Sequence, residues 1–138
     1  MSTPAKTKTR QTKKSKTSAN IIWFEIPADK PERAKKFYSA LFGWKINKFP
    51  GVADYWHIDT GGPDASPDGG LMTRKHPEQP ITNYVNVPSV EKAAAKVEKL
   101  GGKICMSKTA VPEMGYFVVC QDTENNMFAL WEINRNAK

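Results

Sequence analysis

Histidine, cysteine and long apolar runs are all scarce in this chain. Its 138 residues include only two histidines and two cysteines. No well-formed hydrolytic triad is evident with two histidines. No stretch approaches the roughly 18 apolar residues that a membrane-spanning helix needs, so we expect no membrane association. The sequence also lacks the GxxxxGK[ST], GxGxxG, GxSxG and CxxC patterns, which argues against P-loop nucleotide binding, dinucleotide binding, hydrolase and thioredoxin-like redox chemistry.

The two cysteines, Cys105 and Cys120, lie too far apart in the sequence for a CxxC pair. We therefore expect both to be free, buried thiols of a protein that works in the reducing cytoplasm. A chain of this length is large enough to bury a core without disulfides or a structural metal.

Acidic residues are absent from the first 20 positions, which carry six basic ones. Taken from the total of 21 Lys and Arg, these six leave 15 basic residues against 14 acidic ones in the rest of the chain. The net charge of +7 therefore belongs almost entirely to residues 1–20. This segment has too few apolar side chains to fold, so we predict a disordered basic tail. It acts either as a solubilising arm or through weak electrostatic contact with a polyanion.

The rest of the chain, residues 21–138, reads as one domain in which a single pattern occurs twice. An alternating strand over 21–28 precedes a helix in which Asp29 is the expected cap and Pro31 lies in the first turn. The apolar residues of this helix fall at helical spacing, and Gly43 ends it; they are Ala34, Phe37, Tyr38, Leu41 and Phe42. Three strand candidates follow, at 44–49, 55–60 and 70–74.

The second copy begins with an alternating strand over 81–88 and continues with a helix capped by Ser89 and stopped by Gly101. Its three strand candidates cover 103–106, 116–121 and 127–133. A repeat of this length indicates two tandem βαβββ modules, at 21–76 and 80–133, and the fold class is α+β.

One helix can cover only one face of its module's strands. The residues that we expect to face the core are Ile22, Phe24, Ile26, Val85, Val87, Phe128 and Leu130. The opposite faces carry Trp23, Glu25, Tyr84, Asn86, Ala129 and Trp131. This mixture of aromatic and polar groups is typical of a ligand cavity, so we predict that the uncovered faces form a cleft.

Three sequence stretches, in this order, resemble the vicinal oxygen chelate superfamily: ADKPERAKKFYSALFGW, GGLM, and GYFVVCQDTENNMFALWE. That superfamily includes glyoxalase I, extradiol dioxygenases and bleomycin-binding proteins, and within it the chain is most similar to short proteins related to lactoylglutathione lyase. The resemblance implies the glyoxalase/bleomycin-resistance/dioxygenase fold, in which a curved mixed sheet surrounds a cleft. It also makes a homodimer plausible.

The resemblance also locates the positions that hold a metal ion in metal-dependent members. In this sequence they fall at Trp23, at Gly70 or Leu71, at Thr82 or Asn83, and at Ala129. None of these is a His, Glu, Asp or Cys, whereas a divalent cation needs three or four converging ligands. We therefore predict neither a bound metal nor another cofactor, and the resemblance does not carry over glyoxalase I or dioxygenase chemistry.

Two residues are candidates for acid/base catalysis. Glu25 lies beside Trp23 on the uncovered face and is suited to proton abstraction, although a hydrogen bond to polar groups of the cavity, or a dimer contact, is the simpler interpretation. His57 alternates with Trp56 and Ile58 and is expected to face away from the core, where an exposed strand histidine is the simpler interpretation. If the two residues meet, a metal-free acid/base pair becomes possible.

The remaining candidates are ligand-binding residues, and the aromatic members are the stronger signal because something must cover their rings. The set comprises Trp23, Met72, Tyr84, Asn86, Tyr116 and Trp131. A flat ligand would cover these rings, and so would a dimer interface or inner packing.

The leading hypothesis is a protein that binds a small, flat or aromatic molecule without a metal. The alternatives are a lyase or isomerase that uses Glu25 with His57 or a rebuilt metal site, and an interaction module that works through the basic tail.

Overall fold

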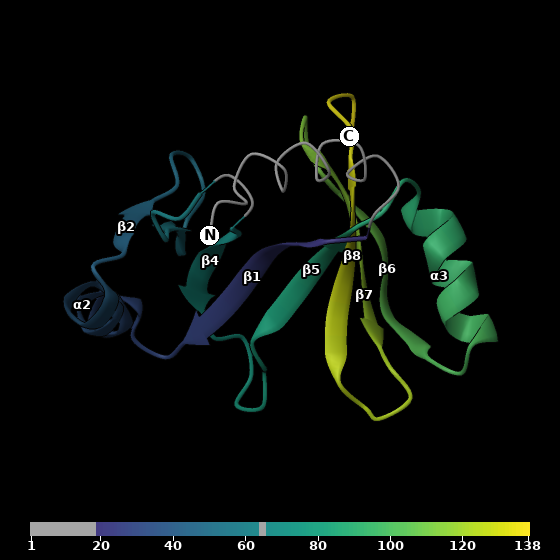
Figure 1. Ribbon diagram of the computed structural model, residues 1–138, viewed down its shortest axis with the longest axis horizontal. Coiled ribbons are helices and arrows are strands. Elements are labelled where there is room, and N and C mark those ends of the chain that lie inside the picture. The colour runs from purple at the N-terminus through teal and green to yellow at the C-terminus, as the bar shows by residue number, and fades with distance from the viewer. Residues whose placement is uncertain (1–18, 64–65) are drawn as a thin grey trace, which may run out of the picture. The chain divides into compact units, whose positions relative to one another are not determined.

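The computed structural model describes residues 19–63 and 66–138, which fall into two compact units: Ile21–Tyr84, and Val85–Lys138 together with Ala19 and Asn20 (Figure 1). We refer to them as the first and the second unit and describe each by itself. The predicted disorder of residues 1–20 falls almost wholly outside the described residues. Among these residues, no helix is long and apolar enough to cross a membrane.

The first unit has the predicted βαβββ order. It consists of β1 (Ile21–Ala28), α2 (Pro31–Phe42), β2 (Lys45–Lys48), β3 (Tyr55–Asp59) and β4 (Asp68–Thr73). Its strands lie in the order β2-β3-β4-β1. β1 and β4 pair in parallel, and the other two pairs are antiparallel.

The second module repeats this order, and its first strand straddles the boundary between the units. It consists of β5 (Thr82–Asn86), α3 (Val90–Lys99), β6 (Lys103–Val111), β7 (Gly115–Gln121) and β8 (Met127–Ile133). Its strands lie in the order β5-β8-β7-β6. The predicted α+β fold with two tandem βαβββ modules is confirmed.

Each unit buries one face of its strands under its own helix (Figure 1). The first core comprises Ile26, Ala28, Ile46, Trp56, Ile58 and Leu71, against which Ala34 and Tyr38 of α2 pack. The second comprises Val90, Val118, Cys120 and Leu130, covered by Ala93, Ala94 and Val97 of α3. The alternation predicted for β1 is confirmed, because Ile26 is buried and Phe24 packs on the first core while Trp23 and Glu25 do not belong to it.

The apolar face of α2 is narrower than we predicted. Phe37, Leu41 and Phe42 are 60%, 58% and 55% exposed. Ala34 and Tyr38, four residues apart, supply the contact with the core.

The predicted cap of α2 is also wrong. The helix begins after Lys30 and has no side-chain cap, while the Asp29 carboxylate accepts a hydrogen bond from Arg74 Nε at 3.0 Å. The cap predicted for the other helix is confirmed, because Ser89 Oγ accepts from the Lys92 amide at 3.1 Å.

The cysteine prediction holds for one residue and fails for the other. Both thiols are free, but Cys120 is buried and Cys105 is exposed. The pairing of β6 with β7 is irregular between Ile104 and Met106, so Cys105 lies at a bulge rather than in a regular alternation.

Candidate functional site

The face of the first unit that points away from its core carries a row of residues across three strands. Glu25 on β1 and His57 on β3 both have Gly70 on β4 as their cross-strand partner. Register partners point to the same side of a sheet, so the glycine leaves a gap between the carboxylate and the imidazole. With strands about 4.8 Å apart, the two backbones are separated by roughly 10 Å.

The side chain of Tyr55 fills this gap. A Cβ atom built on Gly70 would overlap the Tyr55 hydroxyl group, so only glycine leaves room for the phenol ring at this point. The ring of Phe49 packs against Tyr55, with 5.6 Å between the centroids.

The Tyr55 hydroxyl belongs to a connected set of hydrogen bonds that we call the Glu25 cluster, formed by Trp23, Glu25, Tyr55 and Tyr84. Tyr55 donates to Glu25 Oε2 at 2.7 Å, and Tyr84 donates to Glu25 Oε1 at 3.0 Å. The Trp23 indole Nε1 donates in turn to the Tyr55 oxygen at 3.0 Å. Both oxygens of Glu25 therefore act as acceptors, which is the pattern of an ionised carboxylate.

The two phenols of the cluster hold their protons firmly. Burial raises the pKa of Tyr55 and that of Tyr84 above the ordinary tyrosine value. The negative charge of Glu25 and the hydrogen bonds to Glu25 raise both pKa values further. They remain neutral donors to Glu25 and do not compensate its charge.

A second polar pair lies on the same face. His57 Nε2 and Asp68 Oδ2 are 3.1 Å apart, and the other oxygen of Asp68 accepts from the amide and the hydroxyl of Thr60 at 3.1 and 3.3 Å. The side chains of His57 and Asp68 are 40% and 34% exposed, so the pair is open to a ligand.

The His57 ring also forms part of an aromatic platform with Trp23 and Phe49. The planes of His57 and Trp23 are within 4° of parallel, with centroids 5.7 Å apart. Phe49 lies at a tilt 5.7 Å from His57. Such offset stacking leaves ring faces on which a flat molecule can stack.

The structure brings together four of the predicted site residues: Trp23, Glu25, His57 and Tyr84. Glu25 and His57 share a face as predicted, but among the described residues no hydrogen bond joins them. Each is bonded to another partner, because the phenol of Tyr55 stands between the two strands.

The other predicted ligand-binding residues have different surroundings. Met72 lies on the same face, but it is only 9% exposed. Tyr116, in the second unit, packs against that unit's core, and Lys108 Nζ lies 4.2 Å from its ring centroid. Trp131 and Asn86 also belong to the second unit, and the ligand-binding role of these three residues stays a prediction.

Sequence reasoning missed Tyr55 and Asp68. Tyr55 lies two residues before His57 in an alternating strand, so the period of two could have placed it on the same face. Asp68 had no such signal, since it lies at the end of a Pro- and Asp-rich stretch that reads as a turn, whereas β4 begins with it.

The residues present do not fit a metal ion of the kind that the resemblance implies. Among the described residues, no group of three or more His, Cys, Asp and Glu side chains converges. Of the family's ligand positions, Gly70 is covered by the Tyr55 hydroxyl, and Leu71 and Ala129 are fully buried. Each oxygen of Glu25 already accepts a hydrogen bond from a tyrosine.

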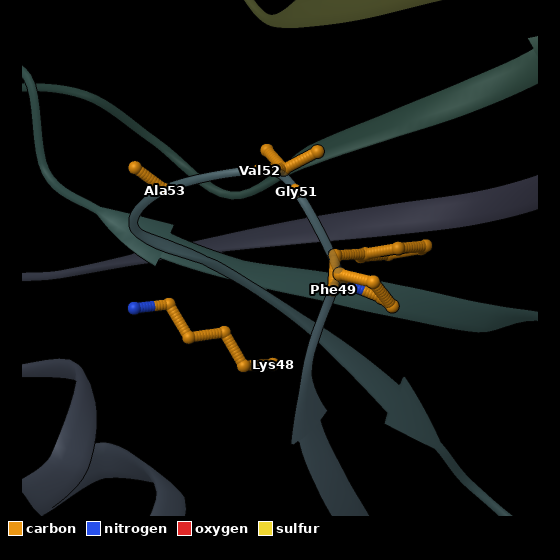
Figure 2. A pocket seen from close by; sticks show the side chains of 6 residues that line it. Lys48, Phe49, Gly51, Val52 and Ala53 are labelled. Carbon is orange, nitrogen blue, oxygen red and sulfur yellow. The ribbon is translucent and has the colours of Figure 1, made fainter.

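A surface hollow of about 540 Å³ lies beside the platform, at the turn between β2 and β3 (Figure 2). It is lined by Lys48, Phe49, Pro50, Gly51, Val52 and Ala53. Phe49 is the one residue that this hollow shares with the platform. Apart from Lys48 the lining has no ionisable group, so the hollow offers apolar contact rather than chemistry.

Known proteins are similar to this chain in sequence and in fold. Residues 20–61 match the family model described as bleomycin resistance protein-like N-terminal. A glyoxylase-like domain-containing protein of Didymella fabae is 33% identical over 116 residues, which cover 80% of this chain and 91% of that protein. A candidate glyoxylase of Mycobacterium bovis, CFP32, is 29% identical over 119 residues, 83% of this chain, but the chain spans only 46% of its length.

A solved structure supports the same relationship at the level of the fold. A glyoxalase/bleomycin resistance protein/dioxygenase superfamily member from Vibrio splendidus 12B01 superposes with a TM-score of 0.60. The match covers 85% of this chain and all of the other, at 11% sequence identity.

Proposed function

Because this chain belongs to the glyoxalase/bleomycin-resistance/dioxygenase (vicinal oxygen chelate) superfamily, we propose that it binds a small, flat molecule on the Trp23 and His57 rings, without a bound metal. Glu25 orients the ligand. The superfamily contains both binding proteins and enzymes, so the fold alone does not choose between them, and the proposal is supported by the site.

The observation that carries the proposal is the near-parallel stack of Trp23 and His57 next to a carboxylate that two tyrosines hold in place. Stacking on such rings contributes about 0.5–1.5 kcal/mol beyond the buried area. A carboxylate with its rotamer fixed by two donors adds direction, because it has lone pairs left for a ligand group.

The experiment is a calorimetric screen of flat aromatic compounds against the full chain, repeated after treatment with a chelating resin. We expect binding that survives the treatment, and a Trp23→Leu variant that weakens it at least about 10-fold. Trp44→Phe is the matched control, because Trp44 packs against the first core and not on the platform. Binding that is lost after the chelating resin has removed metal ions would refute the proposal. Binding that is unchanged in Trp23→Leu would refute it too.

A second function, that of a lyase or isomerase acting next to a carbonyl group, is favoured by one observation. Glu25 is an acceptor in direct contact with two phenols that keep their protons, and a carboxylate base beside neutral acids is a recurring arrangement in proton transfer. Glu25→Gln should then abolish turnover and leave binding largely intact. Equal turnover in the variant would remove this alternative.

The proposal also includes a reducing, cytoplasmic setting and a possible homodimer. The free thiols of Cys105 and Cys120 suit such a compartment. Light scattering of the purified chain over a range of concentrations measures the oligomeric state.

A further inference from the structure

On the basis of that binding function, we propose that the flat ligand is an organic cation whose charged nitrogen lies against Glu25. The inference deepens the proposed function by giving the ligand a charge. It rests on three features of the first unit: the charge balance around Glu25, the rings beside it, and the position of a second carboxylate.

Glu25 has no charged partner among the residues that the structure describes. The ion pairs there join Arg74 to Asp29 and Lys108 to Glu91, His57 Nε2 lies within hydrogen-bond distance of Asp68, and Glu25 takes part in none of these contacts. Its two partners are phenols that stay neutral. Hydrogen bonds offset part of the cost of keeping a partly buried carboxylate away from water, but a counter-charge would offset more.

The arginine that follows β4 is already engaged elsewhere. Arg74 Nε donates to Asp29 at 3.0 Å, and its Nη1 donates to the Gln79 carbonyl oxygen at 2.9 Å. Neither this arginine nor any ion pair among the described residues gives Glu25 a positive partner, and a ligand can bring one.

The rings around Glu25 favour the same charge. A cation over the face of a Trp or Tyr ring gains about 0.5–2 kcal/mol, and Trp23, Tyr55 and Tyr84 all belong to the Glu25 cluster. A planar cation can stack on an indole and hold its positive edge towards the carboxylate at the same time.

Trp23 also lies between two carboxylates on one face of the sheet. Glu25 is two residues along β1, and Asp68 is the cross-strand partner of Trp23 on β4. The potential over the platform is therefore more negative than a neutral aromatic surface would make it, which disfavours anionic ligands.

The test compares N-methylquinolinium with quinoline by calorimetry on the full chain at pH 8, where quinoline is uncharged. The two probes have the same fused rings and differ in charge and one methyl group. We expect the cation to bind at least about 10-fold more tightly, and Glu25→Gln to reduce this preference to less than 2-fold. Glu91→Gln is the matched control, because Glu91 is an exposed carboxylate of the second unit, and the preference should persist in it.

Equal binding of the two probes would overturn the cation inference while leaving the proposed binding of flat molecules in place. Binding of neither, together with a blank screen of flat compounds, would overturn both. If Glu25→Gln fails to fold, the wild-type chain still gives the answer. Tetramethylammonium should then compete with N-methylquinolinium more strongly than sodium does at equal ionic strength, and equal competition would refute the inference.

Discussion

A single methyl group added at Gly70 should disrupt the Glu25 cluster. In Gly70→Ala the new Cβ overlaps the Tyr55 hydroxyl, so the phenol must move and lose its bonds to Glu25 and Trp23. Overpacking costs about 1–3 kcal/mol, a lost hydrogen bond to a charged group about 1.5–3, and a neutral one about 1. Because a phenol that moves aside relieves the overlap, the lost hydrogen bonds set the cost, and we expect a loss of about 2.5–4 kcal/mol, against a total stability of roughly 5–15 kcal/mol for a domain of this kind.

The assay is urea unfolding of a double-mutant cycle with Gly70→Ala and Tyr55→Leu. Because leucine is too short to reach over residue 70, the cost of the added methyl should fall below about 1 kcal/mol in that background. Gly61→Ala is the control, since Gly61 has a φ of 74° but no atom within 4 Å of its built Cβ, and its cost should not depend on residue 55. An equal cost of Gly70→Ala in both backgrounds would refute the placement of Tyr55 over Gly70.

Three further predictions concern pH, thiol reactivity and the tail. The pKa values of Tyr55 and Tyr84 are raised in the folded state. The free energy of unfolding should therefore keep its full value below the ordinary tyrosine pKa of about 10. Above that pH it should fall, by up to about 1.4 kcal/mol per pH unit for each phenol. Urea unfolding between pH 8 and 11 measures this slope, and Tyr84→Phe should flatten it; an unchanged slope contradicts the reasoning. Burial and, to a smaller extent, the proximity of Cys105 raise the pKa of the Cys120 thiol to about 11. Iodoacetamide at pH 8 should therefore label Cys105 alone. Equal labelling of the two cysteines in peptide mass spectra would contradict this prediction. Deletion of residues 1–19 should abolish heparin binding at low salt and leave the melting temperature unchanged, and retained binding would show that the tail is not the polyanion contact.

The elements of this fold were predictable because their signals are local. Alternation in residues 21–28 separates Trp23 and Glu25 from Phe24 and Ile26 whatever the strand pairs with, since successive side chains of a strand point to opposite faces. Ser89 caps the start of α3 and Gly43 caps the end of α2, each through a property of its own residue type. The repeated order of such elements was enough to indicate two βαβββ modules.

Predictions that depended on the surroundings of a residue were less successful. The spacing of Phe37 and Leu41 indicates the side of α2 that is apolar, but not how much of it the sheet covers, and both are more than half exposed. Asp29 has the right chemistry for a cap, yet its carboxylate bonds to Arg74, 45 residues away in the chain. A competing partner that is distant in sequence has no local signature.

The candidate site divides in the same way. The sequence alone determined that Glu25, Trp23 and His57 lie on faces turned away from the core, because the period of the strands decides this. Only the tertiary structure decided what they touch. The register of β1 and β3 on β4 places Gly70 between Glu25 and His57, and it sets the Tyr55 phenol, 30 residues from Glu25 in the chain, into that gap. Register is a property of paired strands and not of either strand alone, so the hydrogen bonds that define the Glu25 cluster come into being only when the sheet forms.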